Sequence, residues 1–326
     1  MEALSLEKGD HDGDRLVSKF FPGKPTNNMF ASIPAFLRVP LVVLLIVLST
    51  IAHTMPLFAI ALLKWLLPIP RFQAACARVL VRIAESWIGF NSHLMDWFTG
   101  TRFRVEGLDG LLADGHYLVL SNHQSWVDIL VMQKVLNRRI PFLRFFLKSQ
   151  LIWVPLLGLA WWALDFPFMR RASRKQLAKR PDLAAKDVIA TRRACEKFKG
   201  IPVSIMNFVE GTRFTAEKHA RQGSPYVHLL RPKAGGVAFV LDAMGSALHS
   251  VLDVTIAYSG GTPTLMDLIA GRIPEVRFHV RQREIPEVLL QSDYEKDAAS
   301  RVRFQRWINA IWSDKDELLS QGVTTS

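Results

Sequence analysis

An uncharged apolar segment near the start of the chain limits the possible folds more than any other feature. Between Val39 and Leu63 there are 25 residues and no Asp, Glu, Lys or Arg. As a helix this segment rises about 1.5 Å per residue, enough to cross a hydrocarbon layer of about 30 Å with some tilt. Pro56 removes a backbone donor and predicts a kink or break. A single membrane span and a helical hairpin that enters one leaflet therefore both stay open.

Basic residues flank this segment on both sides. Lys19, Lys24 and Arg38 precede it, and Lys64, Arg71, Arg78 and Arg82 follow it. The larger cluster on the carboxyl-terminal side favours a cytoplasmic domain after the segment. Residues 71–98 are amphipathic and rich in Trp, Phe and Leu, which predicts helix along the membrane surface. The predicted organisation is a flexible polar tail at 1–28, a membrane anchor with interfacial helices at 29–98 and a folded domain at 99–326.

The remainder of the chain alternates short apolar runs with helical patterns, which predicts an α/β domain. The predicted strands are Thr101–Val105, Tyr117–Leu120, Pro141–Leu147, Pro202–Val209, Val251–Tyr258 and Glu275–Val280. The predicted helices are Ser125–Leu136, Lys186–Lys199, Gly235–Met244 and Asp297–Trp312. In the last helix Phe304, Trp307, Ile308, Ile311 and Trp312 recur at helical spacing and predict a stripe that packs on the domain.

Charge and motif content narrow the function classes. The 41 basic and 29 acidic residues give a net charge of +12, which favours phospholipid headgroups, phosphorylated substrates or nucleic acid as partners. Cys76 and Cys195 belong to no CxxC motif, so we expect no disulfide framework. GxSxG, GxxxxGK[ST], GxGxxG and HExxH motifs are absent from the sequence. These are the usual motifs of hydrolases, nucleotide-binding proteins and zinc proteases, so their absence disfavours these classes. We expect no metal and no cofactor.

A first polar patch follows the predicted strand at 117–120. Ser121 with Gln124 matches a capping box and places His123 in the first turn of a helix. Asp128 is five residues further on, so a turn before the helix is needed to bring its carboxylate to the imidazole. If they pair, one ring nitrogen is fixed and the other can take a proton from a substrate hydroxyl. The alternative is that His123 caps the helix and Asp128 faces water.

A second polar patch, Glu210-Gly211-Thr212-Arg213, ends the predicted strand at 202–209. Gly211 permits a tight turn, Thr212 can donate a hydrogen bond and Arg213 offers a fork for phosphate. Glu210 is expected to orient Arg213 or to hold a substrate hydroxyl. The alternative is a solvated turn with an ion pair.

A third patch, Phe166–Arg180, is basic and follows the apolar run Leu156–Leu164. Apolar surface beside basic side chains is typical of a lipid interface, and the alternative is a solvated basic face. Nucleic-acid binding is disfavoured because of the apolar run and the anchor.

Together these patches resemble the glycerolipid acyltransferase family, which includes bacterial 1-acylglycerol-3-phosphate acyltransferases. The family's first block, Asn-His, four residues and Asp, is matched at Asn122–Asp128, and its Glu-Gly-Thr-Arg block is matched at Glu210–Arg213. The resemblance covers about residues 95–285. It implies a mixed sheet flanked by helices, with His123 as general base, Asp128 as its orienting partner and Arg213 as a phosphate ligand. Glu210, Gly211 and Thr212 are then part of the acceptor site.

Further correspondences complete the implied site. The stretch from Gly158 to Arg170 or Arg171 looks like the family's second block, whose arginine contacts phosphate. Lys148 looks like the lysine between the first two blocks, whereas Val254–Tyr258 lacks the proline of the fourth block. The stretches FPFMRR at 166–171 and FVEGTRFT at 208–215 look closest to a subgroup that includes a bacterial inner-membrane branch and mitochondrial or reticular lysophospholipid acyltransferases.

The resemblance implies transfer of a fatty acyl group from acyl-CoA or acyl carrier protein to 1-acyl-sn-glycerol-3-phosphate, giving phosphatidic acid. It implies no cofactor, no metal and no nucleic acid, and a catalytic domain on the cytoplasmic side of the cell inner membrane. One alternative is another acceptor, such as lysophosphatidylinositol, lysophosphatidylglycerol or lysocardiolipin. The other is a non-catalytic adaptor on anionic membranes.

Overall fold

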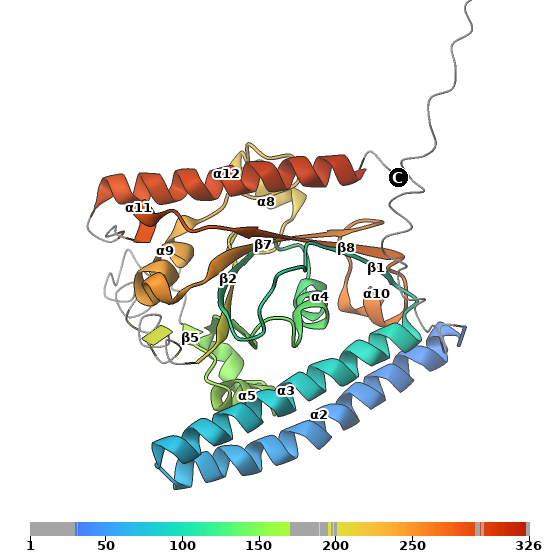
Figure 1. The fold of residues 1–326 in the computed structure, drawn as a ribbon. Helices are drawn as coiled ribbons and strands as arrows, with labels where there is room; N and C mark the ends of the chain where they lie inside the picture. Colours follow the sequence, from blue (N-terminus) through green and yellow to red (C-terminus); the bar gives the residue numbers. More distant parts are fainter. Residues whose placement is uncertain are drawn as a thin grey trace, which may run out of the picture.

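The centre of the molecule is a six-stranded sheet with the strand order β1-β8-β7-β2-β6-β3 (Figure 1). The computed structural model describes residues 30, 32–169, 189, 195–196, 198, 201–290, 294 and 297–323. The strands are β1 (Arg102–Glu106), β2 (His116–Ser121), β3 (Leu143–Phe145), β6 (Val203–Phe208), β7 (Ser250–Tyr258) and β8 (Glu275–Arg283). A separate pair joins β4 (Leu147–Lys148) to β5 (Phe168–Met169).

The sheet is mixed, as expected. β3, β6, β2 and β7 run parallel to one another, β8 runs antiparallel to β7, and β1 is parallel to β8. The carboxyl ends of β7, β2 and β6 therefore lie side by side at one edge, which is where α/β folds place their sites.

Helices cover both faces of this sheet. One face packs against α4 (Val127–Leu136), α5 (Leu157–Ala163) and α10 (Leu265–Ile269), and the other against α9 (Ala234–Met244), α11 (Glu287–Leu290) and α12 (Ala298–Val323). The short elements η1 (Ser149–Trp153), α8 (Ala216–Gln222) and η2 (Gly245–Ala247) lie between these. Successive side chains of β2 point to opposite faces of the sheet. Tyr117 and Val119 belong to the hydrophobic core on the α4 side, and Leu118 and Leu120 belong to the core on the α12 side.

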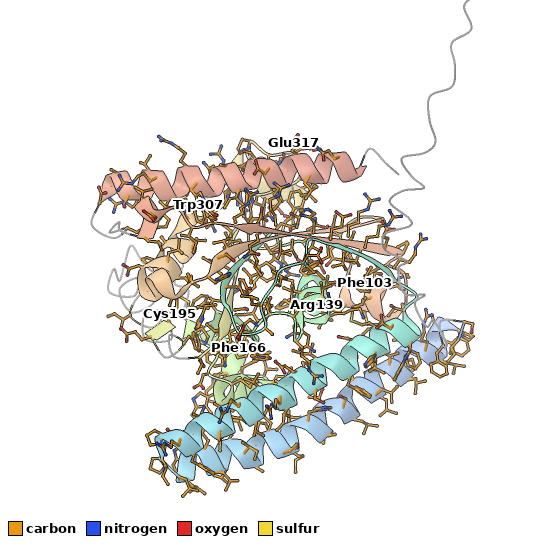
Figure 2. All side chains as sticks on the ribbon, viewed as in Figure 1. Phe103, Arg139, Phe166, Cys195, Trp307 and Glu317 are labelled. Atoms are coloured by element: carbon orange, nitrogen blue, oxygen red, sulfur yellow. The ribbon has the colours of Figure 1, made fainter. Side chains whose placement is uncertain are left out.

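Figure 2 shows Phe166 between the sheet and the amino-terminal helices and Trp307 on α12. The stripe predicted for the last helix is confirmed, because Phe304, Ile308, Ile311 and Trp312 are at most 2% exposed. The helix itself extends to Val323, beyond the predicted end.

The amino-terminal region is a hairpin of two long helices, α2 (Ala35–Leu66) and α3 (Pro70–Phe98). Of the kink or break predicted at Pro56, the break is wrong, since α2 continues through this residue and the hairpin turns at 67–69. Helix α2 packs along α3 over this stretch, where Trp87 Nε1 donates to Thr50 Oγ1 at 3.2 Å. Thr54 Oγ1 also donates to the carbonyl of Thr50, at 2.8 Å.

Both ends of α2 are tied to the same side of the α/β domain. Near its start the Arg38 guanidinium donates to the carbonyl of Ala270, directly after α10. Near its end Lys64 Nζ lies 2.9 Å from the Asp165 carboxylate, directly after α5. Among the described helices, α2 is long and apolar enough to cross a membrane. Its outward side exposes large apolar side chains, including Phe36, Leu44, Met55 and Trp65.

Five of the predicted strands correspond to β1, β2, β6, β7 and β8, while the prediction at 141–147 covers the shorter β3 and part of β4. The helices predicted at 125–136 and 235–244 are α4 and α9, and the amphipathic helix predicted at 71–98 is α3. The helix predicted at 186–199 falls almost entirely outside the described residues. Helices α5, α10 and α11 were not predicted, because each is at most seven residues long and too short for a clear helical pattern.

Candidate active site

His123 lies in a loop between β2 and α4, at the sheet edge where β2, β6 and β7 end. The predicted capping box is wrong. Ser121 is the last residue of β2, and its hydroxyl donates to the carbonyl of Asn122 at 2.9 Å. The helix begins only at Val127, because the loop before it satisfies its polar groups on Asp128.

The imidazole of His123 contacts the carboxylate of Asp128, with 2.8 Å between Nδ1 and Oδ2. The same oxygen accepts the backbone N–H groups of Gln124 (2.6 Å) and Ser125 (2.9 Å), so the loop folds around it. The Tyr258 hydroxyl, at the end of β7, donates to Oδ1 at 2.6 Å. One buried carboxylate thus accepts hydrogen bonds from four donors.

This arrangement fixes the tautomer of His123. An ionised carboxylate only accepts hydrogen bonds, so Nδ1 carries the proton in the neutral imidazole and Nε2 is the acceptor. Burial, followed by the neighbouring Asp128 charge, raises the pKa of Tyr258, which keeps its hydroxyl a donor. The His123 side chain is 13% exposed, so the ring is still accessible to a substrate.

The ring of His123 is also held from its face. Phe208, the last residue of β6, stacks on it with ring centroids 3.7 Å apart and an interplanar angle of 15°. The backbone carbonyl of His123 accepts the N–H of Phe214 at 2.7 Å, which ties the loop to the segment after Arg213. The two sequence blocks are therefore in direct contact.

Other residues of the first block fasten the loop to the sheet. The Asn122 amide pairs with the backbone of Ile256 in β7 in both directions, at 2.9 and 3.0 Å. Ser125 Oγ donates to the carbonyl of Pro263 at 2.5 Å and accepts from the N–H of Val127 at 3.1 Å. The sequence did not indicate Tyr258 and Phe208, although both end strands that border β2 in the sheet.

The turn at Glu210–Arg213 separates its two charged side chains. Gly211 has φ of +70°, and a Cβ there would lie 3.0 Å from Lys233 Nζ. Arg213 is exposed, and its guanidinium carbon lies 5.1 Å from the centre of the Trp126 ring. Thr212 Oγ1 accepts a hydrogen bond from Lys218 Nζ at 2.9 Å, so this hydroxyl is also held in place.

Glu210 is 1% exposed, and no ion pair joins it to Arg213 among the described residues. Burial raises the pKa of the Glu210 carboxyl to about 8, against an opposing effect of the Lys315 ammonium. The carboxyl is thus part of the interior rather than of the exposed face of the turn.

A buried ionic cluster lies between β7 and α12, on the far side of the sheet. Lys315 is fully buried, with Nζ 2.6 Å from Asp253 Oδ1 and hydrogen bonds to the carbonyl of Val254 (2.5 Å) and Thr255 Oγ1 (3.1 Å). Arg283 of β8 completes the cluster at 2.9 Å from the second Asp253 oxygen. The sequence patterns did not indicate this cluster, because Asp253 and Lys315 lie 62 positions apart in the chain.

Of the three other predicted site residues, Lys148, Arg170 and Arg171, the structure describes Lys148. Lys148 is exposed in β4 and lies opposite Met169 in the β4–β5 pair. Arg170 and Arg171, the next residues, lie outside the described part of the chain, as does the basic patch beyond them. Within the described residues, no group of His, Cys, Asp and Glu could hold a metal ion.

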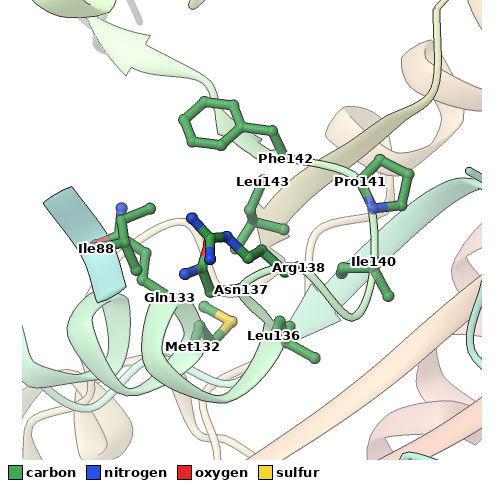
Figure 3. A pocket seen from close by; sticks show the side chains of 10 residues that line it. All are labelled: Ile88, Met132, Gln133, Leu136, Asn137, Arg138, Ile140, Pro141, Phe142 and Leu143. Carbon is green, nitrogen blue, oxygen red and sulfur yellow. The ribbon is translucent and has the colours of Figure 1, made fainter. Parts of the chain in front are cut away.

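A small cavity between α3 and the end of α4 holds about 10 Å³. Its lining includes Ile88, Met132, Leu136 and Phe142, and the Arg138 side chain lies across it (Figure 3). That volume corresponds to about one water molecule, so the cavity as it stands is too small for a substrate.

Comparison with known proteins bears on the chemistry of this site. Residues 102–259 match the model of the family described as Acyltransferase. The chain is 26% identical over 250 residues to 1-acyl-sn-glycerol-3-phosphate acyltransferase 3 of Arabidopsis thaliana, covering 71% of this chain and 61% of that protein. It is 24% identical over 258 residues to 1-acyl-sn-glycerol-3-phosphate acyltransferase gamma of Homo sapiens, covering 74% and 63%. The chain thus matches about three-fifths of the length of these relatives.

Two further proteins are similar to this chain over a smaller or a larger share of its length. The 2-acyl-1-lysophosphatidylinositol acyltransferase of Saccharomyces cerevisiae is 24% identical over 144 residues, covering 38% of this chain and 34% of that protein. The crystal structure of the 1-acyl-sn-glycerophosphate (LPA) acyltransferase PlsC from Thermotoga maritima aligns with a TM-score of 0.48 at 18% identity, covering 85% of this chain and 97% of that one. Residues 102–259 of this chain thus match an acyltransferase family model, and the chain is distantly similar to 1-acyl-sn-glycerol-3-phosphate acyltransferases.

Proposed function

We propose that this chain is a membrane-attached lysophospholipid acyltransferase whose acceptor is 1-acyl-sn-glycerol-3-phosphate. The observation that carries the proposal is the His123–Asp128 pair, with Nδ1 bonded and Nε2 left as the acceptor. A hydrogen bond from Phe214 to His123 joins this pair to the turn that carries Arg213. A base and an exposed arginine on adjacent loops suit an acceptor that has both a hydroxyl and a phosphate.

The reaction is a direct acyl transfer. His123 Nε2 takes the proton of the acceptor hydroxyl while the oxygen forms a bond to the thioester carbonyl. The resulting tetrahedral oxyanion collapses, the carbon–sulfur bond breaks, and the thiol of CoA or acyl carrier protein leaves with the proton from His123. Asp128 stabilises the imidazolium that exists between these steps, and Arg213 binds the acceptor phosphate. Thr212 and Gly211 shape the turn that presents Arg213.

The α2–α3 hairpin attaches the enzyme to one leaflet. At about 1.5 Å per residue the 32 residues of α2 extend about 48 Å, yet both of its ends contact the same side of the domain. A helix held in this way lies along the membrane surface with its apolar side in the lipid. Arg71, Arg78 and Arg82 of α3 can then interact with anionic headgroups, and Lys148, Arg170 and Arg171 with the acceptor. The proposed location is the cytoplasmic side of the cell inner membrane.

The decisive experiment measures acyl transfer from labelled oleoyl-CoA to 1-oleoyl-glycerol-3-phosphate by the full chain in membranes. His123→Ala should lower the rate about 10²–10⁴-fold, because it removes the general base. His249→Ala, at an exposed histidine just before β7 and at the opposite end of that strand from Tyr258, should leave the rate unchanged. Equal activity of wild type and His123→Ala would rule out the mechanism.

The same assay separates the acceptors. One relative is named as a lysophosphatidylinositol acyltransferase, so lysophosphatidylinositol, lysophosphatidylglycerol and lysocardiolipin should be compared at equal concentration. Acyl-CoA and acyl carrier protein thioesters should be compared as donors. A non-catalytic adaptor predicts no His123-dependent transfer with any acceptor or donor.

A further inference from the structure

Two residues outside the assigned site hold Arg213 from different directions. Trp126 belongs to the loop between β2 and α4, is 50% exposed and lies under the guanidinium at 5.1 Å. Lys218 lies in the first turn of α8, and its Nζ donates to the backbone carbonyl of Arg213 at 2.8 Å and to Thr212 Oγ1 at 2.9 Å. One residue thus contacts the Arg213 side chain and the other its backbone.

We propose that Trp126 and Lys218 are positioning residues that hold Arg213 in the orientation that binds the acceptor phosphate. The inference rests on the proposed function, because it takes Arg213 to be the phosphate ligand. It adds two residues to the acceptor site and links its two loops through a side chain.

The contact with Trp126 restricts the conformations of the exposed Arg213 side chain before a ligand binds. A free arginine side chain has many rotamers, and binding a ligand requires most of them to be given up. An indole attracts the flat face of the guanidinium, so the N–H groups at its edge stay free for a bidentate contact with phosphate. Among the described residues no carboxylate forms an ion pair with Arg213.

Lys218 restricts the backbone conformation of the turn at Glu210–Arg213. Thr215 caps α8 by accepting the N–H of Lys218 at 3.2 Å, so the base of the lysine is fixed. Its ammonium group donates hydrogen bonds to both Thr212 and Arg213, the two residues after Gly211, whose φ is positive. Another hydrogen bond that anchors this turn is the one from the Phe214 N–H to the carbonyl of His123.

The test is a double-mutant cycle on the full chain in mixed micelles, with kcat and KM measured for 1-oleoyl-glycerol-3-phosphate. Trp126→Ala should raise KM roughly 3–10-fold with kcat within about twofold, as for loss of a single cation–π contact used equally in substrate and transition state. Trp126→Phe should recover part of this effect, because a phenyl face binds a cation less strongly than an indole. Lys218→Met should raise KM by a similar factor.

Each effect should disappear when Arg213 is already replaced by alanine, since a positioning residue acts only through the residue it positions. Trp162→Ala is the matched control, because Trp162 is 54% exposed and lies in α5. Whatever that variant does to lipid binding should be the same with and without Arg213.

The outcomes separate the inference from the function. If Arg213→Ala leaves KM unchanged, the phosphate role of Arg213 fails and the inference fails with it. If Arg213→Ala raises KM but Trp126→Ala multiplies it further, as Trp162→Ala does, Trp126 is a lipid contact and only the inference is overturned. If Lys218→Met keeps its effect in the Arg213→Ala background, Lys218 binds phosphate directly and its positioning role is wrong.

Discussion

The Asp128 carboxylate accepts hydrogen bonds from His123, Tyr258 and two backbone N–H groups. An asparagine there keeps the shape but turns one acceptor into a donor that faces other donors. We expect Asp128→Asn to lower kcat by about 10²–10⁴, because the tautomer of His123 is no longer fixed. Asp109→Asn, at an exposed aspartate, is the control and should have wild-type kcat. A kcat within twofold of wild type for Asp128→Asn would contradict the role of the pair.

Glu210 gives a prediction of pH dependence. Burial raises its pKa from an ordinary value of 4.5 to about 8, so the folded protein keeps a proton that the unfolded chain releases. The contribution of this group to stability is therefore fully present below pH 4.5 and is lost as the pH rises through about 8. Glu210→Gln cannot ionise and lacks this loss.

The measurement is the Tm of wild type and Glu210→Gln between pH 5 and 9 in one detergent. We expect the variant to gain a few degrees on wild type as the pH rises, given roughly 2–4 °C per kcal/mol for a chain of this size. Parallel Tm curves would mean that Glu210 is already ionised and paired in the folded protein.

At the scale of elements, Lys315 determines how α12 is joined to β7. Removing one partner of a buried ion pair costs about 3–5 kcal/mol when the other charge is left uncompensated. Asp253 keeps Arg283 as a partner, so Lys315→Met should lower the free energy of unfolding by less than this, about 1–3 kcal/mol, measured by denaturant titration. The exposed pair of Arg221 and Glu217, 3.6 Å apart, supplies the control. Arg221→Met should change stability by less than about 0.5 kcal/mol, and an equally small effect for Lys315→Met would contradict the cluster's contribution.

The packing of α5 depends on the absence of a side chain at Gly158. A Cβ at this position would lie 2.0 Å from the backbone carbonyl oxygen of Ile152, so the helix would have to move. We expect Gly158→Ala to lower the free energy of unfolding by about 1–3 kcal/mol, as overpacked core positions do. Gly235→Ala has a nearest neighbour at 3.6 Å and should be close to neutral. Thermal unfolding of the two variants, run side by side, tests the difference.

At the scale of the whole molecule, the hairpin predicts how deeply α2 enters the lipid. Single cysteines at Phe36, Met55 and Trp65 sample the start, the middle and the end of its exposed side. Because Cys76 and Cys195 are buried, cysteine-specific fluorophores should react at the introduced sites. A helix along the surface places all three probes at similar shallow depth in quenching experiments with lipid-attached quenchers. A deep probe at Met55 with both end probes near the headgroups of opposite leaflets would show a membrane span instead.

The sequence by itself determined the features that depend on residues close together in the chain, namely the longer strands and helices and the two polar blocks. Alternating and helical patterns predicted the long strands, α3, α9 and the buried stripe of α12, because burial on one face imposes a period. The two polar blocks were found because each follows directly after a strand. Residues 39–63 were identified as apolar helix for the same local reason, since length and the absence of charge are properties of the segment alone.

Only the tertiary structure decided which residues meet. The contact of His123 with Asp128 required a loop that the capping rule did not predict, because that loop folds on Tyr258 and on Ile256, more than a hundred residues away. Likewise α2 continues through Pro56 because α3 packs along it, and Lys315 is stable in the interior because Asp253 of β7 pairs with it. Such contacts depend on chain segments brought together by the whole fold, and no short window of sequence contains both partners.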